Sequence, residues 1–145
     1  MSVSDFTVRI GEPADHPLVY SATAGTFRFS PYYLRMSPAS YSATITGIVG
    51  RMLQSWTLLT AVVTAVPEEI AGFLLCKPQV AALSLYVKQP YRRRGVGRML
   101  LEHGQLQNFV AVLGSPRAFK LAREKGLEVQ FSPYFGIMEG VTHNG

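Results

Sequence analysis

Cysteine is almost absent from this chain of 145 residues, in which Cys76 is the only one. A single cysteine excludes an internal disulfide, and the simple interpretation is a protein of a reducing compartment. We therefore expect a cytoplasmic location. At this length the chain is expected to form one domain, residues 1–145, with a core large enough to fold without a covalent staple.

Long apolar runs are also missing. The longest, "WTLLTAVVTAV" at 56–66, has eleven residues, whereas a membrane-spanning helix needs about 20. The first residues, "MSVSDF", show no basic region followed by an apolar run, so we expect no signal peptide. Neither pattern favours a membrane protein.

Charge is scarce as well, at 16% of residues, yet the basic residues are unevenly placed. Arg92, Arg93, Arg94 and Arg98 fall within seven positions of a chain whose net charge is +5. Such a cluster could bind phosphate, nucleic acid or an acidic partner, or it could be a solvated loop. Nucleic acid is disfavoured, because the basic residues are not interleaved with aromatic residues and form no stripe along a helix.

Apolar periodicity predicts an α/β (α+β) fold with a mixed central sheet. We expect strands at 6–10, 56–66, 70–76, 82–88, 109–113, 128–130 and 134–138, with a turn at 67–69. We expect helices from about 15 to 25, from the Ser37–Pro38 cap to about 54, from 96 through 106, and from 116 to 126. The strands at 82–88 and 109–113, which a helix joins, should be parallel to each other, with a right-handed crossover.

The stretch "LYVKQPYRRRGVGRMLL" at 85–101 passes from strand to helix through Gly95 and Gly97. Glycines allow positive φ and close approach to the main chain. The unpaired N–H groups and dipole of a helix start favour an anion. The stretch lacks both the Gly-Lys-[Ser/Thr] ending of a P-loop and the third glycine of a Rossmann fingerprint. It therefore predicts a phosphate site of another kind.

Residues 92–97, "RRRGVG", match the pattern [Gln/Arg]-x-x-Gly-x-[Gly/Ala]. This resembles the coenzyme A pyrophosphate loop of the GNAT superfamily, the acyl-CoA-dependent N-acyltransferases. The preceding "YVKQPYR" and the following amphipathic helix fit the same pattern. Downstream, "SPRAFKLAREKGLEV" at 115–129 resembles a later family helix, with matches at Ser115, Ala118, Leu121, Gly126 and Leu127. The wording of 86–96 is closest to small GNAT-like proteins of tailed bacteriophages, which would place the chain in the host cytoplasm or the virion.

The resemblance implies a GNAT-like mixed central sheet of six to seven strands with helices on both faces. It implies acetyl-CoA (coenzyme A) as cofactor and no metal. Main-chain groups of Leu85, Tyr86 and Val87 would bind the pantetheine arm, with an N–H near Val87 polarising the thioester carbonyl. Ser115 stands where the family often has an asparagine that bonds the arm. The pyrophosphate would lie on Arg92, Arg93, Arg94, Gly95, Val96, Gly97 and Arg98. Phe119 could pack on the cofactor or in the core.

Catalytic groups depart from the family pattern. The tyrosine that commonly protonates the leaving thiolate would fall at Ala122, and a frequent carboxylate would fall near Ala81. Tyr86 and Tyr134 are the substitutes to test, although either could be structural. His103, on the apolar stripe of its helix, is interpreted as a core residue. Cys76 is interpreted in the same way, because nothing nearby in sequence would lower its pKa.

Two functions therefore remain open. The first is an acetyl-CoA-dependent N-acetyltransferase acting on an unidentified amine, either a small molecule or a protein. The second is a catalytically idle GNAT-like domain used for binding or assembly, for example in a bacteriophage particle. Five aromatic residues could form either core or an aromatic surface: Phe27, Phe29, Tyr32, Tyr33 and Tyr134. Such a surface could bind a hydrophobic acceptor substrate, a protein partner or a second copy of the chain.

Overall fold

A computed structural model describes residues 5–28, 33–106, 108–111, 120, 124 and 128–131. Only the main chain is described for residues 81, 83, 108–111 and 128–131. The expected helix at 116–126, apart from Lys120 and Glu124, and the expected strand at 134–138 lie outside the described residues.

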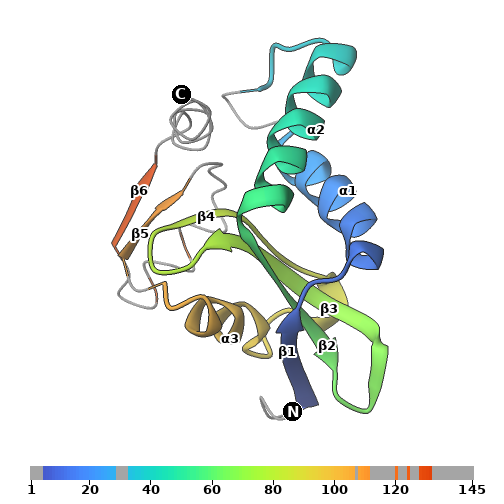
Figure 1. Cartoon of the computed structure of the whole chain (residues 1–145), viewed down its shortest axis with the longest axis vertical. Helices are drawn as coiled ribbons and strands as arrows, with labels where there is room; N and C mark the ends of the chain where they lie inside the picture. Colours follow the sequence, from blue (N-terminus) through green and yellow to red (C-terminus); the bar gives the residue numbers. More distant parts are fainter. Residues whose placement is uncertain are drawn as a thin grey trace.

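The described elements form a mixed sheet with helices (Figure 1). In chain order they are β1 (Phe6–Ile10), the 3-10 turn η2 (Pro13–Asp15), α1 (His16–Phe27), α2 (Pro38–Ser55), β2 (Thr57–Val63), β3 (Val66–Lys77), β4 (Ala81–Val87), the 3-10 turn η3 (Gln89–Tyr91), α3 (Val96–His103), β5 (Asn108–Ala111) and β6 (Glu128–Phe131). The strands lie in the order β1-β2-β3-β4-β5-β6. Neighbours from β1 to β4 are antiparallel, and the pairs β4–β5 and β5–β6 are parallel. The predictions of a mixed sheet and of a parallel β4–α3–β5 unit are confirmed.

The core has two layers because successive side chains of a strand point to opposite faces. Phe73 and Leu75 of β3 pack with buried residues of α1 and α2. Leu74 and Cys76 pack with α3 on the other face. Figure 1 shows α1 and α2 on one side of the sheet and α3 on the other, so the prediction of helices on both faces is confirmed.

Helix α2 begins where its sequence predicts. The Ser37 hydroxyl oxygen accepts a hydrogen bond from the Ser40 amide at 3.1 Å, and Pro38 occupies the first turn, where a missing N–H costs nothing. The helix buries a stripe that consists of Tyr41, Ile45, Ile48, Val49 and Met52. This stripe covers the sheet face formed by Phe73 and Leu75.

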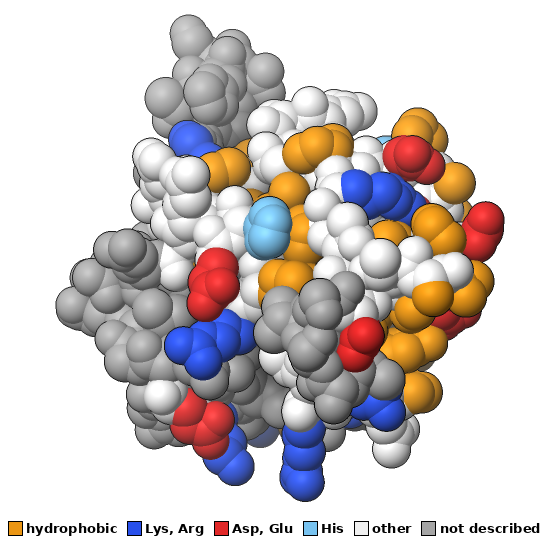
Figure 2. All heavy atoms as spheres, turned by 90° about the horizontal axis from the view of Figure 1, so that it is seen from below, with side chains coloured by type: hydrophobic (Ala, Val, Ile, Leu, Met, Phe, Trp, Pro, Cys, Tyr) orange, Lys and Arg blue, Asp and Glu red, His pale blue; other side chains and the backbone are white. Residues whose placement is uncertain are grey.

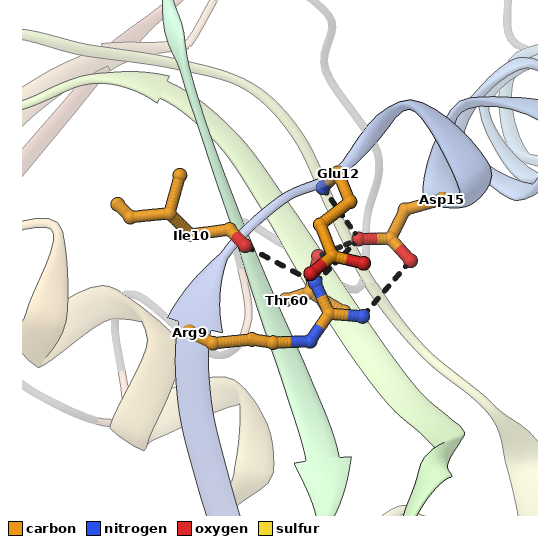
Figure 3. A network of polar contacts seen from close by, with 5 residues as sticks. All are labelled: Arg9, Ile10, Glu12, Asp15 and Thr60. Atoms are coloured by element: carbon orange, nitrogen blue, oxygen red, sulfur yellow. Dashed lines mark hydrogen bonds and ion pairs between the residues drawn. The ribbon is translucent and has the colours of Figure 1, made fainter.

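A buried carboxylate fixes the corner between β1 and α1 (Figure 3). Asp15 accepts hydrogen bonds from Arg9 Nη1 at 2.8 Å and Nη2 at 3.0 Å, from the Glu12 amide at 2.9 Å and from Thr60 Oγ1 at 3.1 Å. Burial alone would raise the pKa of Asp15, but these hydrogen bonds and the positive charge of Arg9 outweigh it and hold the pKa below its usual value. The carboxylate therefore ties three elements together in its ionised form.

Some boundaries differ from the predictions; for example, α3 ends at His103 and not at 106. The chain reverses between β2 and β3 at Thr64 and Ala65, so the expected turn at 67–69 was wrong. Val63 pairs with Val66 and Val62 with Ile70, so residues 67–69 are extra on the β3 side. Pro67 has no N–H to give to a ladder and is tolerated in such a bulge. Helix α1 continues past Gly25 to Phe27, because the next turn still buries an aromatic ring in the core.

Within the described ranges, none of the helices combines the length and the apolar character that crossing a bilayer requires.

Candidate functional site

The end of β4 carries main-chain groups that face away from β3. The Lys88 amide donates to the Ala71 carbonyl at 2.8 Å, so Ala71 and Lys88 form a hydrogen-bonded pair. In an antiparallel pair, hydrogen-bonded and non-hydrogen-bonded pairs alternate. The pairs Gly72–Val87 and Leu74–Leu85 are therefore of the second kind. Leu85 and Val87 consequently direct their N–H and C=O groups toward the β5 side.

The pairing of β4 with β5 is short in the part of the chain that the structure describes. It covers only Ala81 with Val110 and Ala82 with Ala111. The outward groups of Leu85 and Val87 lie beyond this pairing, on the same edge of β4. Of the three residues predicted to bind a pantetheine arm, Leu85 and Val87 direct their main-chain groups toward this edge, and Tyr86 directs its groups to Phe73 of β3.

The loop after β4 adopts the left-handed conformations that a concave main chain needs. Arg93 has φ of 66° and Gly95, the N-cap of α3, has φ of 85°. Gly95 meets no Cβ penalty there, which explains the glycine. The first helical hydrogen bond of α3 runs from the Met99 amide to the Gly95 carbonyl at 3.0 Å. The amides of residues 96–98 precede that bond and have no helical acceptor, so they are available to an anion.

The four arginines of the cluster do different things. Arg92 Nε donates to the Val87 carbonyl at 2.8 Å, and its guanidinium lies 5.9 Å from the centre of the Tyr86 ring. Arg98 pairs with Glu102 at 3.2 Å along the helix. Arg93 and Arg94 are exposed. Arg92 thus contacts the end of β4, and Arg98 lies along the surface of α3.

The predicted catalytic tyrosines have different outcomes. Tyr86 is half-buried on the α1–α2 side of the sheet, with its ring 5.8 Å from that of Phe73. Tyr134 lies outside the described residues, as do Ser115, Phe119 and Ala122. Ala81 is the first residue of β4, so that position supplies no carboxylate.

One core prediction was wrong and one was confirmed. His103 is exposed, with Nδ1 2.9 Å from the Met99 carbonyl oxygen, because α3 ends at this residue and the chain turns away at Gly104. Cys76 is fully buried, and burial raises the pKa of its thiol to about 11. It is therefore a small core residue with no nucleophilic role.

The aromatic surface is reduced in the described part of the chain. Phe27 and Tyr33 are buried in the core with α2, and the Tyr33 ring meets that of Tyr41 edge-on at 5.6 Å. For these two residues the core alternative is confirmed. Phe29 and Tyr32 lie outside the described residues.

Figure 2 shows a face on which basic and acidic side chains are interspersed among hydrophobic ones. No continuous basic patch is visible among the coloured residues there. Nucleic-acid binding needs a basic patch or stripe. The described residues of this face therefore show no basic patch of the kind that nucleic-acid binding needs.

A buried polar pair was missed in the sequence. Thr23 Oγ1 of α1 donates to Ser84 Oγ of β4 at 3.1 Å, and both residues are buried. The pair ties α1 to the strand just before Leu85. Hydroxyl residues inside apolar runs were the available signal, but only the packing of α1 on β4 shows that they meet.

Comparison with known proteins agrees with this geometry. Residues 29–105, from the approach to α2 through the end of α3, match the acetyltransferase (GNAT) family. The chain belongs to the GNAT acetyltransferase family. The GNAT resemblance of the loop at 92–97 is thus confirmed at the level of the family, while the bacteriophage wording stays a prediction. No curated protein matches the chain significantly.

Solved structures share the GNAT fold at low sequence identity. A proposed acetyltransferase from Clostridium difficile 630 has a TM-score of 0.54 and 9% identity, over 83% of this chain and 88% of that one. A proposed acetyl transferase from Pyrococcus furiosus has a TM-score of 0.50 and 15% identity, over 93% of this chain and 90% of that one. At these identities the likeness establishes the fold alone.

Proposed function

We propose that this GNAT protein is an acetyl-CoA-dependent N-acetyltransferase whose acceptor is an amine of a small molecule or a protein. One observation carries the proposal: the outward main chain of Leu85 and Val87 leads directly into a left-handed loop and the free amides that begin α3. A strand edge suits an extended amide-bearing arm, and helix-start amides suit a diphosphate. Coenzyme A has these two parts in that order.

Each part of the site would bind a different part of the molecule. Main-chain groups of Leu85 and Val87, together with Ser115, would hold the arm, whereas those of Tyr86 face Phe73 of β3. The loop of residues 92–98 would hold the diphosphate through its main-chain amides, with the guanidinium groups of Arg93, Arg94 and Arg98 adding charge. The Val87 N–H would donate to the thioester carbonyl oxygen and stabilise the negative charge that develops there.

In the reaction, a neutral amine would attack the thioester carbonyl carbon. A C–N bond forms, the C–S bond breaks, and the proton lost by the amine is taken up by solvent or by the thiolate. Holding the two reactants together can contribute several kcal/mol to such a step without a dedicated acid. Tyr86 and Tyr134 are the proton donors to test, although the Tyr86 ring packs against the core residue Phe73.

The proposal is tested by following free thiol released from acetyl-CoA with a panel of amines and with lysate proteins. Thiol release that requires both the protein and an amine supports it. Binding of acetyl-CoA without turnover on any acceptor would contradict it and would favour the second function, an idle domain used for binding or assembly.

A further inference from the structure

We infer that Arg92 is a positioning residue that acts through its Nε–H group on the end of β4, and that its charge is secondary. The inference rests on the proposed function, because β4 matters here as the strand that receives the acetyl-CoA arm. Arg92 is half-buried, whereas its neighbours Arg93 and Arg94 are exposed. Its guanidinium turns back to the strand that it follows.

The hydrogen bond fixes one particular peptide group. The peptide that joins Val87 to Lys88 donates its N–H to the Ala71 carbonyl at 2.8 Å. Its carbonyl oxygen accepts from Arg92 Nε, also at 2.8 Å. Both ends of this peptide are therefore held, one by β3 and the other by Arg92, and the two hydrogen bonds restrain rotation of its plane.

The position of the fixed peptide gives it a consequence for chemistry. It follows directly after the Val87 N–H group, which faces outward beside the Arg92 bond. An N–H donor stabilises a developing oxyanion only if it is already oriented. The Val87 N–H lies on the preceding peptide, so Arg92 restrains its direction through the Val87 Cα that the two peptides share.

The Arg92 guanidinium lies over the face of the Tyr86 ring. The guanidinium carbon lies 5.9 Å from the ring centre, within the range of a cation–π contact. The ring in turn packs on Phe73, a core residue of β3. Arg92 is therefore held between the half-buried Tyr86 ring and the strand end, which is the setting of a structural link rather than of a mobile anion ligand.

The donor atom makes the inference testable. Glutamine carries an N–H₂ group the same number of bonds from Cα as Arg Nε, whereas lysine has a methylene there and its ammonium one bond further out. A donor at this position is thus shared by arginine and glutamine. Charge, in contrast, is shared by arginine and lysine.

The experiment compares Arg92→Gln, Arg92→Lys and Arg92→Ala for acetyl-CoA affinity by titration calorimetry, after equal melting behaviour without ligand has been checked. We expect Arg92→Gln to bind within about threefold of wild type, and Arg92→Lys and Arg92→Ala to lose about tenfold, the scale of one charge-assisted hydrogen bond. Arg93→Gln, which removes the same charge from an exposed position, measures the purely electrostatic part. Retention in Arg92→Lys with loss in Arg92→Gln would overturn the inference.

A second measurement needs no cofactor, so it separates this inference from the proposed function. In the free protein, the carbonyl ¹³C resonance of Val87 should stay in place in Arg92→Gln and shift in Arg92→Lys and Arg92→Ala. The same displacement in all three variants would show that the ε-position donor does not matter. If the resonances follow the expected order but wild type does not bind acetyl-CoA, the proposed function fails and the role of Arg92 at the strand end stands.

Discussion

Gly72 of β3 lies directly opposite Val87 of β4, and the two strands approach so closely there that no side chain fits on the glycine. A Cβ at Gly72 would overlap the Tyr86 carbonyl oxygen and would lie 3.1 Å from the Val87 Cα. Both contacts are with main chain, which cannot move aside as a flexible side chain can. The close approach thus places the outward groups of Val87.

Replacing this glycine should damage both stability and the site. We expect Gly72→Ala to lower the free energy of unfolding by about 1–3 kcal/mol, because the methyl group forces the strands apart. Acetyl-CoA affinity should fall with it, because Val87 moves. Urea denaturation and calorimetric titration measure the two effects.

The matched control is Gly47→Ala in α2, where a Cβ would meet nothing within 4 Å. Alanine is the better helix former, so this variant should gain about 0.5–1 kcal/mol. Equal effects of the two substitutions would show that the contact between Gly72 and Tyr86 does not exist in solution.

The contribution of the Asp15 carboxylate to stability, at the corner between β1 and α1, should be lost in acid. The pKa of Asp15 is lowered in the folded state, so its contribution is complete at neutral pH and is lost as the pH falls through about 4 toward the folded pKa. Asp15→Asn should cost about 2 kcal/mol at pH 7, because the Arg9 charge loses its partner but keeps some contact with water. It should also flatten the pH dependence of unfolding between pH 5 and about 3.

Glu68→Gln serves as the control, since Glu68 is an exposed carboxylate on β3. It should change the free energy of unfolding by less than about 0.5 kcal/mol. An unchanged acid limb in Asp15→Asn would contradict the role given to the buried pair.

We expect the Cys76 thiol to be unreactive in the folded protein. Burial raises its pKa to about 11, so at pH 8 almost none of it is thiolate. Ellman's reagent should react with the folded protein only as fast as the protein opens, and quickly in denaturing urea. Fast reaction without urea would show that the β3–α3 layer is not closed over the thiol. Because the Cys76 thiol does not react in the folded protein, it should add no background to the thiol-release assay.

Local patterns predicted the elements whose causes are local. The Ser37 cap and the apolar stripe of α2 were readable because each depends on neighbours within a few positions. The loop at Gly95 was readable because a left-handed helix start favours glycine. The glycine opposite Val87 was not, because its reason is a contact between β3 and β4 that only the register reveals.

Errors arose where a pattern continued beyond its element. His103 fits the helical spacing of Val96 and Met99, but α3 ends there, and the last residue of a helix can lie outside the core. Pro67 has the composition of a turn, yet the ladder absorbs it as a bulge. The contact of Arg92 was missed for a related reason. A cluster of like charges indicates an anion site, but the sequence does not show that one of them contacts the end of β4.

The most direct test of the central claim is the melting temperature of wild type and Gly97→Asp with and without acetyl-CoA. An acidic residue in the first turn of a helix is favourable, so the variant should fold, but its carboxylate would occupy the place of the diphosphate. We predict that acetyl-CoA raises the melting temperature of wild type and leaves that of Gly97→Asp unchanged. An equal rise in both proteins, or none in wild type, would contradict the claim that the start of α3 holds the cofactor.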